Sequence, residues 1–191
     1  MVRIVLKLIR ALPRIFLYLP KKMRPQTGDY PAFYDTYISL ATGTDVQSAL
    51  SQSLQTLEAF LHAIPDSRSD FAYAEGKWTV KEVLQHCIDT ERIFAYRALS
   101  HARGEQQSLP GFEQDDYAAT VVVNRRTLAN LVEEFILVRR TTLLLFENLT
   151  QEDLERTGIV NGNPIKTLCW GFIIEGHWLH HQRILKEKYS L

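Results

Sequence analysis

The sequence predicts an all-α protein whose single domain is a four-helix bundle. Four long stretches carry apolar residues at helical spacing, and connections of moderate length separate them. No stretch shows a convincing alternation of apolar and polar residues that would indicate a β-strand, and no internal repeat is present. The 191 residues, 46% of them hydrophobic and 23% charged, suffice for one domain with a substantial core.

The first two long helices are predicted over residues 49–63 and 79–102. In the first, apolar side chains recur every three or four residues, and the turn signal at 65–67 ends the pattern. The second begins at a capping box, in which the Thr79 hydroxyl accepts from the backbone N–H of Glu82 and the Glu82 carboxylate accepts from that of Thr79. The polar and turn-forming residues that begin at Arg103 end this helix.

Residues 104–117 are predicted to form a surface loop, because they are rich in polar and turn-forming residues. The third long helix is expected from about residue 119 to about residue 148. Thr150 is expected to cap a short helical turn through residue 154. The strongest turn signal in the chain, Asn-Gly-Asn-Pro at 161–164, is predicted to open the last helix, over 167–188.

Residues 1–22 differ from the rest of the chain, so the predicted bundle domain covers residues 23–191. Basic residues at positions 3, 7, 10 and 14 fall at helical spacing on one stripe, with apolar residues elsewhere. These charges exclude a transmembrane span, no secretory cleavage site follows them, and Pro13 would kink a helix. Three interpretations are open: a helix that binds a membrane surface or a partner, a helix packed on the domain, or sequence upstream of a true start at Met23.

The charge distribution argues against nucleic acid as a partner. The chain has 22 basic and 22 acidic residues, but six of the basic ones lie in residues 1–22, which leaves 16 against 22 in the remainder. Such an acidic body has no electrostatic attraction for a phosphate backbone. The two cysteines, Cys87 and Cys169, stand in apolar surroundings outside any C-x-x-C pair, so we interpret them as buried thiols of a cytoplasmic protein.

The most informative residues are two histidines, His177 and His181, four positions apart on the last predicted helix. This spacing places both imidazoles on one helix face. The best candidate for a third ligand is His86, on the second predicted helix. Three neutral imidazoles bind a divalent ion and leave a coordination position open, which is the ligand set of a catalytic site. The sequence therefore predicts a metal site, with zinc or nickel expected and copper or iron also compatible.

Three neighbouring residues are candidates for supporting this site. His180 is expected to lie beside it, because it projects about 100° away from His181 around the helix axis. Asp89 and Glu91 follow His86 closely and are candidates for orienting a ligand imidazole through its second ring nitrogen. The alternative for both carboxylates is plain solvation at the helix surface.

Further polar residues of the second helix are weaker candidates. Tyr96 and Arg97, together with Arg92, are candidates for binding an anionic substrate, although charged helix faces are usually only solvated. His62 and His101 are interpreted as ordinary surface or helix-end residues.

The sequence contains no serine or cysteine nucleophile motif, phosphate-binding glycine loop or dinucleotide fingerprint. Any reaction would therefore depend on the metal, which lowers the pKa of a bound thiol or water. Three hypotheses follow: a metal-dependent enzyme acting on a small electrophile, a protein that binds a metal or small molecule without turnover, and a structural bundle whose histidines satisfy one another. A fourth protein ligand such as His180 would favour the second.

Four segments of the chain resemble the DinB/YfiT-like family of metal-binding proteins. They are KWTVKEVLQH at 77–86 with Asp89, PGF at 110–112, NGNP at 161–164 and GHWLHH at 176–181. The similarity extends from about residue 24 to the C-terminus and leaves residues 1–22 uncovered.

The resemblance implies an up-down-down-up four-helix bundle, usually a homodimer, in which three histidines hold a divalent metal ion. Carried over to this chain, they are His86, His177 and His181. The family includes S-transferases and an isomerase that depend on low-molecular-weight thiols such as bacillithiol or mycothiol, and proposed hydrolases. The resemblance thus implies a thiol-dependent S-transferase or a related hydrolase that acts on a small-molecule substrate.

Overall fold

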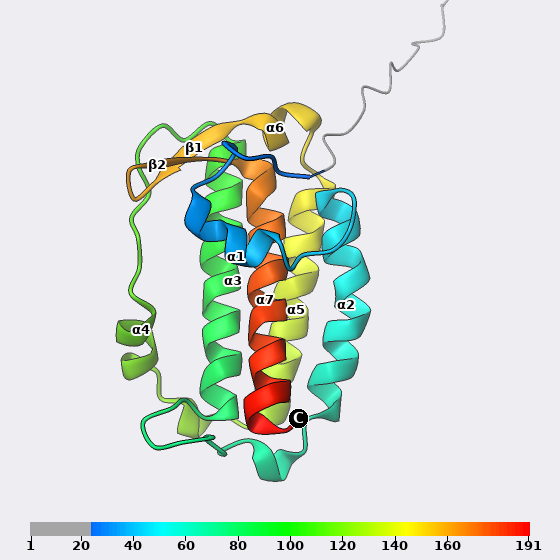
Figure 1. Cartoon of the computed structure of the whole chain (residues 1–191), viewed down its shortest axis with the longest axis vertical. Helices are drawn as coiled ribbons and strands as arrows, with labels where there is room; N and C mark the ends of the chain where they lie inside the picture. The colour runs from blue at the N-terminus through cyan, green and yellow to red at the C-terminus, as the bar shows by residue number, and fades with distance from the viewer. Residues whose placement is uncertain (1–23) are drawn as a thin grey trace, which may run out of the picture.

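The computed structural model describes residues 24–191, and Figure 1 shows their arrangement. The interpretations of residues 1–22, and the start at Met23, lie outside the described residues. Within residues 24–191, no helix combines the length and the apolar character that a membrane span requires.

Four long helices form the body of the molecule, which confirms the predicted four-helix bundle (Figure 1). The first is close to its predicted bounds, the second and fourth agree with theirs almost to the residue, and the third begins later than predicted. The helices are α2 (Val46–Ala63), α3 (Val80–Ala102), α5 (Leu128–Glu147) and α7 (Thr167–Tyr189).

The direction of the helices agrees with the up-down-down-up order that the resemblance implies. In Figure 1, α2 and α7 run down the bundle, whereas α3 and α5 both run up it. Because α3 and α5 are parallel, residues 103–127 must return along the whole bundle to connect them. This long connection carries a short helix, α4 (Gln114–Thr120), which stands beside α3.

Side-chain caps mark where several of the helices begin. The predicted capping box at α3 is confirmed, since Thr79 Oγ1 accepts from Glu82 N at 3.2 Å and Glu82 Oε2 accepts from Thr79 N at 2.7 Å. Thr150 forms a second such box with Asp153 at the start of α6 (Gln151–Glu155), where a short turn was expected. Each box satisfies two backbone N–H groups that have no partner inside their helix.

The prediction that the turn at 161–164 leads directly into the last helix is wrong. The turn joins two short antiparallel strands, β1 (Thr157–Val160) and β2 (Asn163–Lys166), in which Val160 pairs with Asn163. Asn161 and Gly162 adopt φ values of 49° and 76°, the left-handed pair that a tight hairpin turn requires. Four-residue strands are too short for an alternating pattern to be distinguished from a loop.

Two further expectations need correction in the long connection. The predicted loop contains α4, whose first turn carries Asp115 and Asp116, acidic side chains favoured at a helix N-terminus. The third long helix begins at Leu128, after a 3₁₀ turn over Val123–Arg125, and not near residue 119. Thr127 caps it by accepting from Asn130 N, a signal that the broader apolar pattern obscured.

The remaining short elements were not anticipated. A 3₁₀ turn over Ala32–Tyr34 continues into α1 (Asp35–Ile38), and another 3₁₀ turn spans Asp66–Arg68. These segments hold too few residues to show a helical period. Of the three, α1 matters for the site, because it packs across α7.

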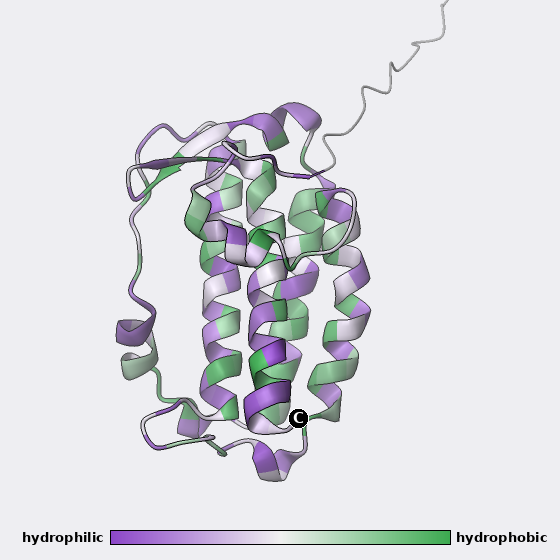
Figure 2. Ribbon diagram, in the orientation of Figure 1, coloured by the Kyte–Doolittle hydropathy of each residue, from purple (hydrophilic) through white to green (hydrophobic). Residues whose placement is uncertain are grey.

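The apolar core consists of two clusters, one toward each end of the bundle. Trp170 is buried in the first and Trp178 in the second, both on α7. Hydrophobic and hydrophilic residues are interspersed along every long helix in Figure 2, as expected for helices that bury one face. Burial of each large apolar side chain contributes roughly 1.5–3 kcal/mol to folding, so these clusters dominate the stability of the bundle.

A buried polar layer separates the two apolar clusters. Each long helix contributes one residue to it: Ser53 from α2, Glu91 from α3, Arg139 from α5 and Glu175 from α7. Arg139 is fully buried and donates to both carboxylates at 2.9 Å and to the serine hydroxyl at 2.8 Å. The layer therefore ties all four helices together at one level.

His101, near the end of α3, makes the free energy of unfolding depend on pH in the mildly acidic range. Its Nδ1 accepts from Trp170 Nε1 at 3.2 Å, and burial lowers its pKa from 6.5 to about 4. Between these two values the unfolded chain binds a proton that the folded chain does not, so the free energy of unfolding falls as the pH falls. We expect His101→Gln to flatten this decline between about pH 7 and about pH 5, measured by urea unfolding. The exposed His62→Gln is the control, and equal slopes in all three proteins would contradict the assignment.

Candidate metal centre

Three buried imidazoles meet between α3 and α7. His86 projects from α3, and His177 and His181 project from α7, with one nitrogen of each ring within 4.8 Å of the others. The Nε2 atoms of His86 and His177 lie 3.1 Å apart. The structure thus brings together the spaced pair His177 and His181 and the predicted third residue, His86.

Local structure explains why these side chains converge. The four-residue spacing on α7 places His177 and His181 one above the other, with ring centroids 4.6 Å apart. The antiparallel packing of α3 against α7 then places His86 opposite both, at 5.0 Å and 4.9 Å between ring centroids. Ligands from two rigid helices hold a fixed geometry better than ligands from loops.

The electrostatic environment keeps all three imidazoles neutral. Burial lowers the pKa of His86 to about 4, and burial together with the neighbouring imidazole of His86 lowers that of His181 to about 3. Burial is also the main cause that lowers the pKa of His177 well below its ordinary value. A neutral imidazole has a free lone pair, so these side chains are in the protonation state that coordinates a metal.

Aromatic side chains pack against two of the three histidines. The Trp78 ring lies 4.9 Å from that of His86, and the rings of Tyr37 and Phe94 lie 5.3 Å and 6.0 Å from that of His177. Tyr37 comes from α1, whose backbone crosses α7 so closely that a Cβ at position 176 would lie 1.8 Å from Tyr37 O. Gly176 therefore permits the contact that covers His177.

His180 lies beside the cluster and is not one of its three members. Its ring is 5.1 Å from that of His181 and 5.8 Å from that of Tyr37. Its Nδ1 is buried without a hydrogen-bond partner among the described residues. The structure therefore places His180 as a neighbour of the site, as its angular offset on the helix had suggested.

The two carboxylates proposed to orient a ligand imidazole make other contacts. Asp89 accepts from Gln85 Nε2 at 2.9 Å. Glu91 is buried and accepts from Arg139 of α5, in the polar layer of the core. The expectation for Glu91 was wrong because the sequence does not reveal which helix packs against it.

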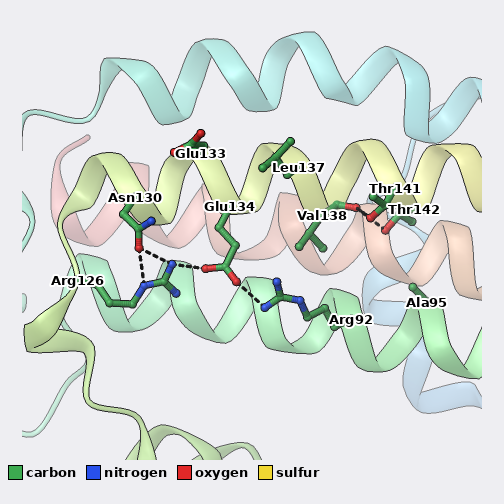
Figure 3. A pocket seen from close by; sticks show the side chains of 10 residues that line it. All are labelled: Arg92, Ala95, Arg126, Asn130, Glu133, Glu134, Leu137, Val138, Thr141 and Thr142. Carbon is green, nitrogen blue, oxygen red and sulfur yellow. Dashed lines mark hydrogen bonds and ion pairs between the residues drawn. The ribbon is translucent and has the colours of Figure 1, made fainter.

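The candidates for binding an anionic substrate are separated in the structure. Tyr96 is exposed, whereas Arg97 is buried on another face of α3. Arg92 pairs with Glu134 of α5 at 2.6 Å and lines an open surface pocket of about 530 Å³ between these helices (Figure 3). Arg126 shares the same carboxylate in that pocket, so its charges are internally compensated. None of the three histidines lines this pocket.

A different pocket reaches the histidine cluster. It has a volume of about 600 Å³, and its walls include His181, Trp78 and Asp115. Asp115 comes from α4, and its charge acts on His86 by raising that residue's pKa, against the larger effect of burial. The sequence did not single out Asp115, because it lay in a predicted loop, nor Tyr37, because no local pattern predicts α1.

These features define a class of protein: a four-helix bundle with three converging histidines between antiparallel helices and a pocket beside them. A sequence model of the DinB superfamily matches residues 49–185, and the chain belongs to this superfamily. The family predicted from the four segments is therefore confirmed.

Comparison with solved structures found a similar fold. YfiT from Bacillus subtilis, described as a probable metal-dependent hydrolase with an unusual four-helix bundle topology, superposes with a TM-score of 0.62 and 16% sequence identity. The alignment covers 88% of this chain and 94% of YfiT. At this identity the similarity shows the fold alone. Among curated proteins, no sequence matched this chain significantly.

Proposed function

We propose that this protein is a divalent-metal-dependent enzyme that delivers a thiol or a water to a small electrophile. His86, His177 and His181 are the proposed metal ligands. The observation that supports this most directly is the convergence of three neutral imidazoles within 4.8 Å of one another. Neutral imidazoles are well suited to donate their lone pairs to a cation.

The donor set fits a catalytic ion better than a structural one. Three nitrogen ligands are one fewer than a closed tetrahedral site requires, and His180 is not part of the group. Imidazole nitrogen suits zinc and nickel. These points favour an enzyme over a protein that only stores or senses a metal.

When bound, a divalent ion lowers the pKa of a thiol or water that coordinates it. Neutral ligands leave the charge of such an ion uncompensated, which favours a thiolate nucleophile. The chain itself supplies the surroundings: the Trp78 ring packs against His86, and the neighbouring pocket has room for a small substrate. Asp115, on the wall of that pocket, is the proposed acceptor of the proton that the nucleophile releases, and its charge already acts on His86.

Hydrolysis is the second candidate within the same proposal. The similar fold of YfiT, described as a probable metal-dependent hydrolase, supports it. A coordinated water and a coordinated thiol would use the same ligands and the same proton acceptor, so an assay must separate them.

Activity should distinguish these reactions. We expect the full chain loaded with zinc or nickel to accelerate transfer of a small thiol to chlorodinitrobenzene about tenfold or more over metal-free protein. Asp115→Asn is expected to reduce the rate about tenfold or more, because the proton acceptor is lost. The adjacent exposed Asp116→Asn is the matched control and should retain the rate.

The alternatives predict different outcomes. Metal-dependent cleavage of a nitrophenyl ester without thiol transfer would assign hydrolysis. A metal-loaded protein that accelerates neither reaction would contradict the enzyme proposal and favour a metal-binding protein without turnover.

A further inference from the structure

A second cavity lies at the end of the bundle that carries the β-hairpin. It has a volume of about 180 Å³, and its lining includes none of the three histidines. Residues from the 3₁₀ turn at 32–34, from α3 and from the hairpin surround it. The side chains that matter for its chemistry are Tyr34, Phe94, Arg97, Phe112, Asn161 and Asn163.

Arg97 brings a positive charge to this cavity without a carboxylate to balance it. Its side chain is 4% exposed, yet among residues 24–191 it forms no ion pair, and its hydrogen bond is to Pro110 O at 2.9 Å. Arg139, the other buried arginine of α3, α5 and α7, donates instead to two carboxylates and a hydroxyl. A guanidinium has five N–H donors, so Arg97 retains donors for a ligand.

Aromatic rings hold the Arg97 guanidinium in place. Its central carbon lies 5.6 Å from the ring centroids of Phe94 and Phe112 and 5.5 Å from that of Trp170. Ring faces attract a cation, but they do not neutralise its charge. The buried charge is therefore positioned and left available, whereas a purely structural arginine is normally paired.

The rest of the lining complements a ligand with an apolar body. Phe94 and Phe112 form apolar walls, and Phe33, which is 63% exposed, adds a third aromatic ring to the lining. Tyr34 and Asn161 also line this cavity, and the side chain of each carries a neutral hydrogen-bond donor.

We propose that this cavity binds a small aromatic carboxylate, whose anionic group pairs with Arg97 and whose ring packs against Phe94 and Phe112. A carboxylate matches the planar guanidinium. The volume of about 180 Å³ is below the roughly 300–1,000 Å³ of sites for drug-sized ligands, so the ligand has a single ring. This site is separate from the metal centre and does not depend on the function proposed there.

Benzoate is the probe that tests this proposal, with neutral benzamide as its uncharged counterpart. In calorimetric titrations of the full chain, we expect benzoate to bind about tenfold or more tightly than benzamide, because only benzoate pairs with Arg97. Arg97→Met is expected to weaken benzoate binding about tenfold or more. Arg92→Met, on the exposed face of the same helix, should change it less than about twofold.

Three results would overturn the site: equal affinity for benzoate and benzamide, undiminished benzoate binding by Arg97→Met, or no saturable binding. The titration is repeated with added zinc. If benzoate binds only to the zinc-loaded protein, and binds Arg97→Met equally well, it is bound at the histidines. That result also overturns the proposed site at Arg97. If Arg97→Met does not fold, Tyr34→Phe and Asn161→Gly replace it, because glycine tolerates the φ of 49° at position 161. Each removes one neutral donor and should weaken benzoate binding several-fold, and unchanged affinity in both would contradict the proposal.

Discussion

Replacing Arg139 with methionine should destabilise the protein by about 3–5 kcal/mol, the largest effect we expect from a single substitution outside the apolar core. The change leaves Glu91 and Glu175 buried without their shared cation. Burial already raises the pKa of Glu175, and Arg139 opposes that rise. Without the arginine, at least one carboxyl group must take up a proton for the bundle to fold. Urea unfolding near neutral pH measures the loss.

The next residue provides a matched control for this experiment. Arg140 pairs with Glu58 at 2.8 Å, but its side chain is 56% exposed. Exposed ion pairs contribute about 0–1 kcal/mol, so Arg140→Met should scarcely change the free energy of unfolding. A triple substitution, Arg139→Met with Glu91→Gln and Glu175→Gln, should recover part of the stability, because neutral amides cost less to bury than unpaired carboxylates. Equal stability of Arg139→Met and Arg140→Met would contradict a paired polar layer.

Replacing His86 with alanine should abolish stoichiometric metal binding. We expect the full chain, purified without a histidine tag, to bind about one zinc or nickel ion and the variant to bind almost none, because two imidazoles of one helix do not complete the site. Elemental analysis after dialysis against the metal measures the content. The variant should remain folded, since it removes one side chain at the edge of the apolar clusters.

Variants at two other histidines test whether the metal is held by the proposed ligands or bound nonspecifically. The exposed His62 of α2 should be replaceable by alanine without loss of metal. His180→Ala should also retain the metal, because His180 lies outside the group of three. Loss of metal from His180→Ala as complete as from His86→Ala would indicate a closed site with four ligands and would argue against catalysis. Full retention of metal by His86→Ala would remove the proposed centre.

The elements most accurately predicted from sequence are those with a local physical signature. The capping box at Thr79 and Glu82 defines the start of α3 because its hydrogen bonds join residues only three apart. That His177 and His181 share one helix face is also a local property, because it follows from the number of residues per helical turn. The hairpin and α4 escaped prediction, because each is shorter than the window over which hydrophobic periodicity becomes distinct.

Contacts between side chains of different helices were predicted less accurately. Glu91 was expected near a histidine, yet it faces Arg139, 48 positions away. Arg97 was considered together with Tyr96 and Arg92. In the structure, Arg97 lines the cavity beside the hairpin, Tyr96 is exposed to solvent, and Arg92 forms a surface ion pair. Which carboxylate meets which cation depends on the rotation and register of packed helices.

The sequence alone determined an all-α bundle, the start of its second long helix and the pair of imidazoles on one face of its last helix. Only the tertiary structure decided that α3 brings His86 to that pair, that Arg139 joins all four helices, and that Arg97 has no acidic partner among the described residues. The reason is physical: helical pitch and capping act over three or four residues, whereas convergence depends on how apolar faces from distant segments pack.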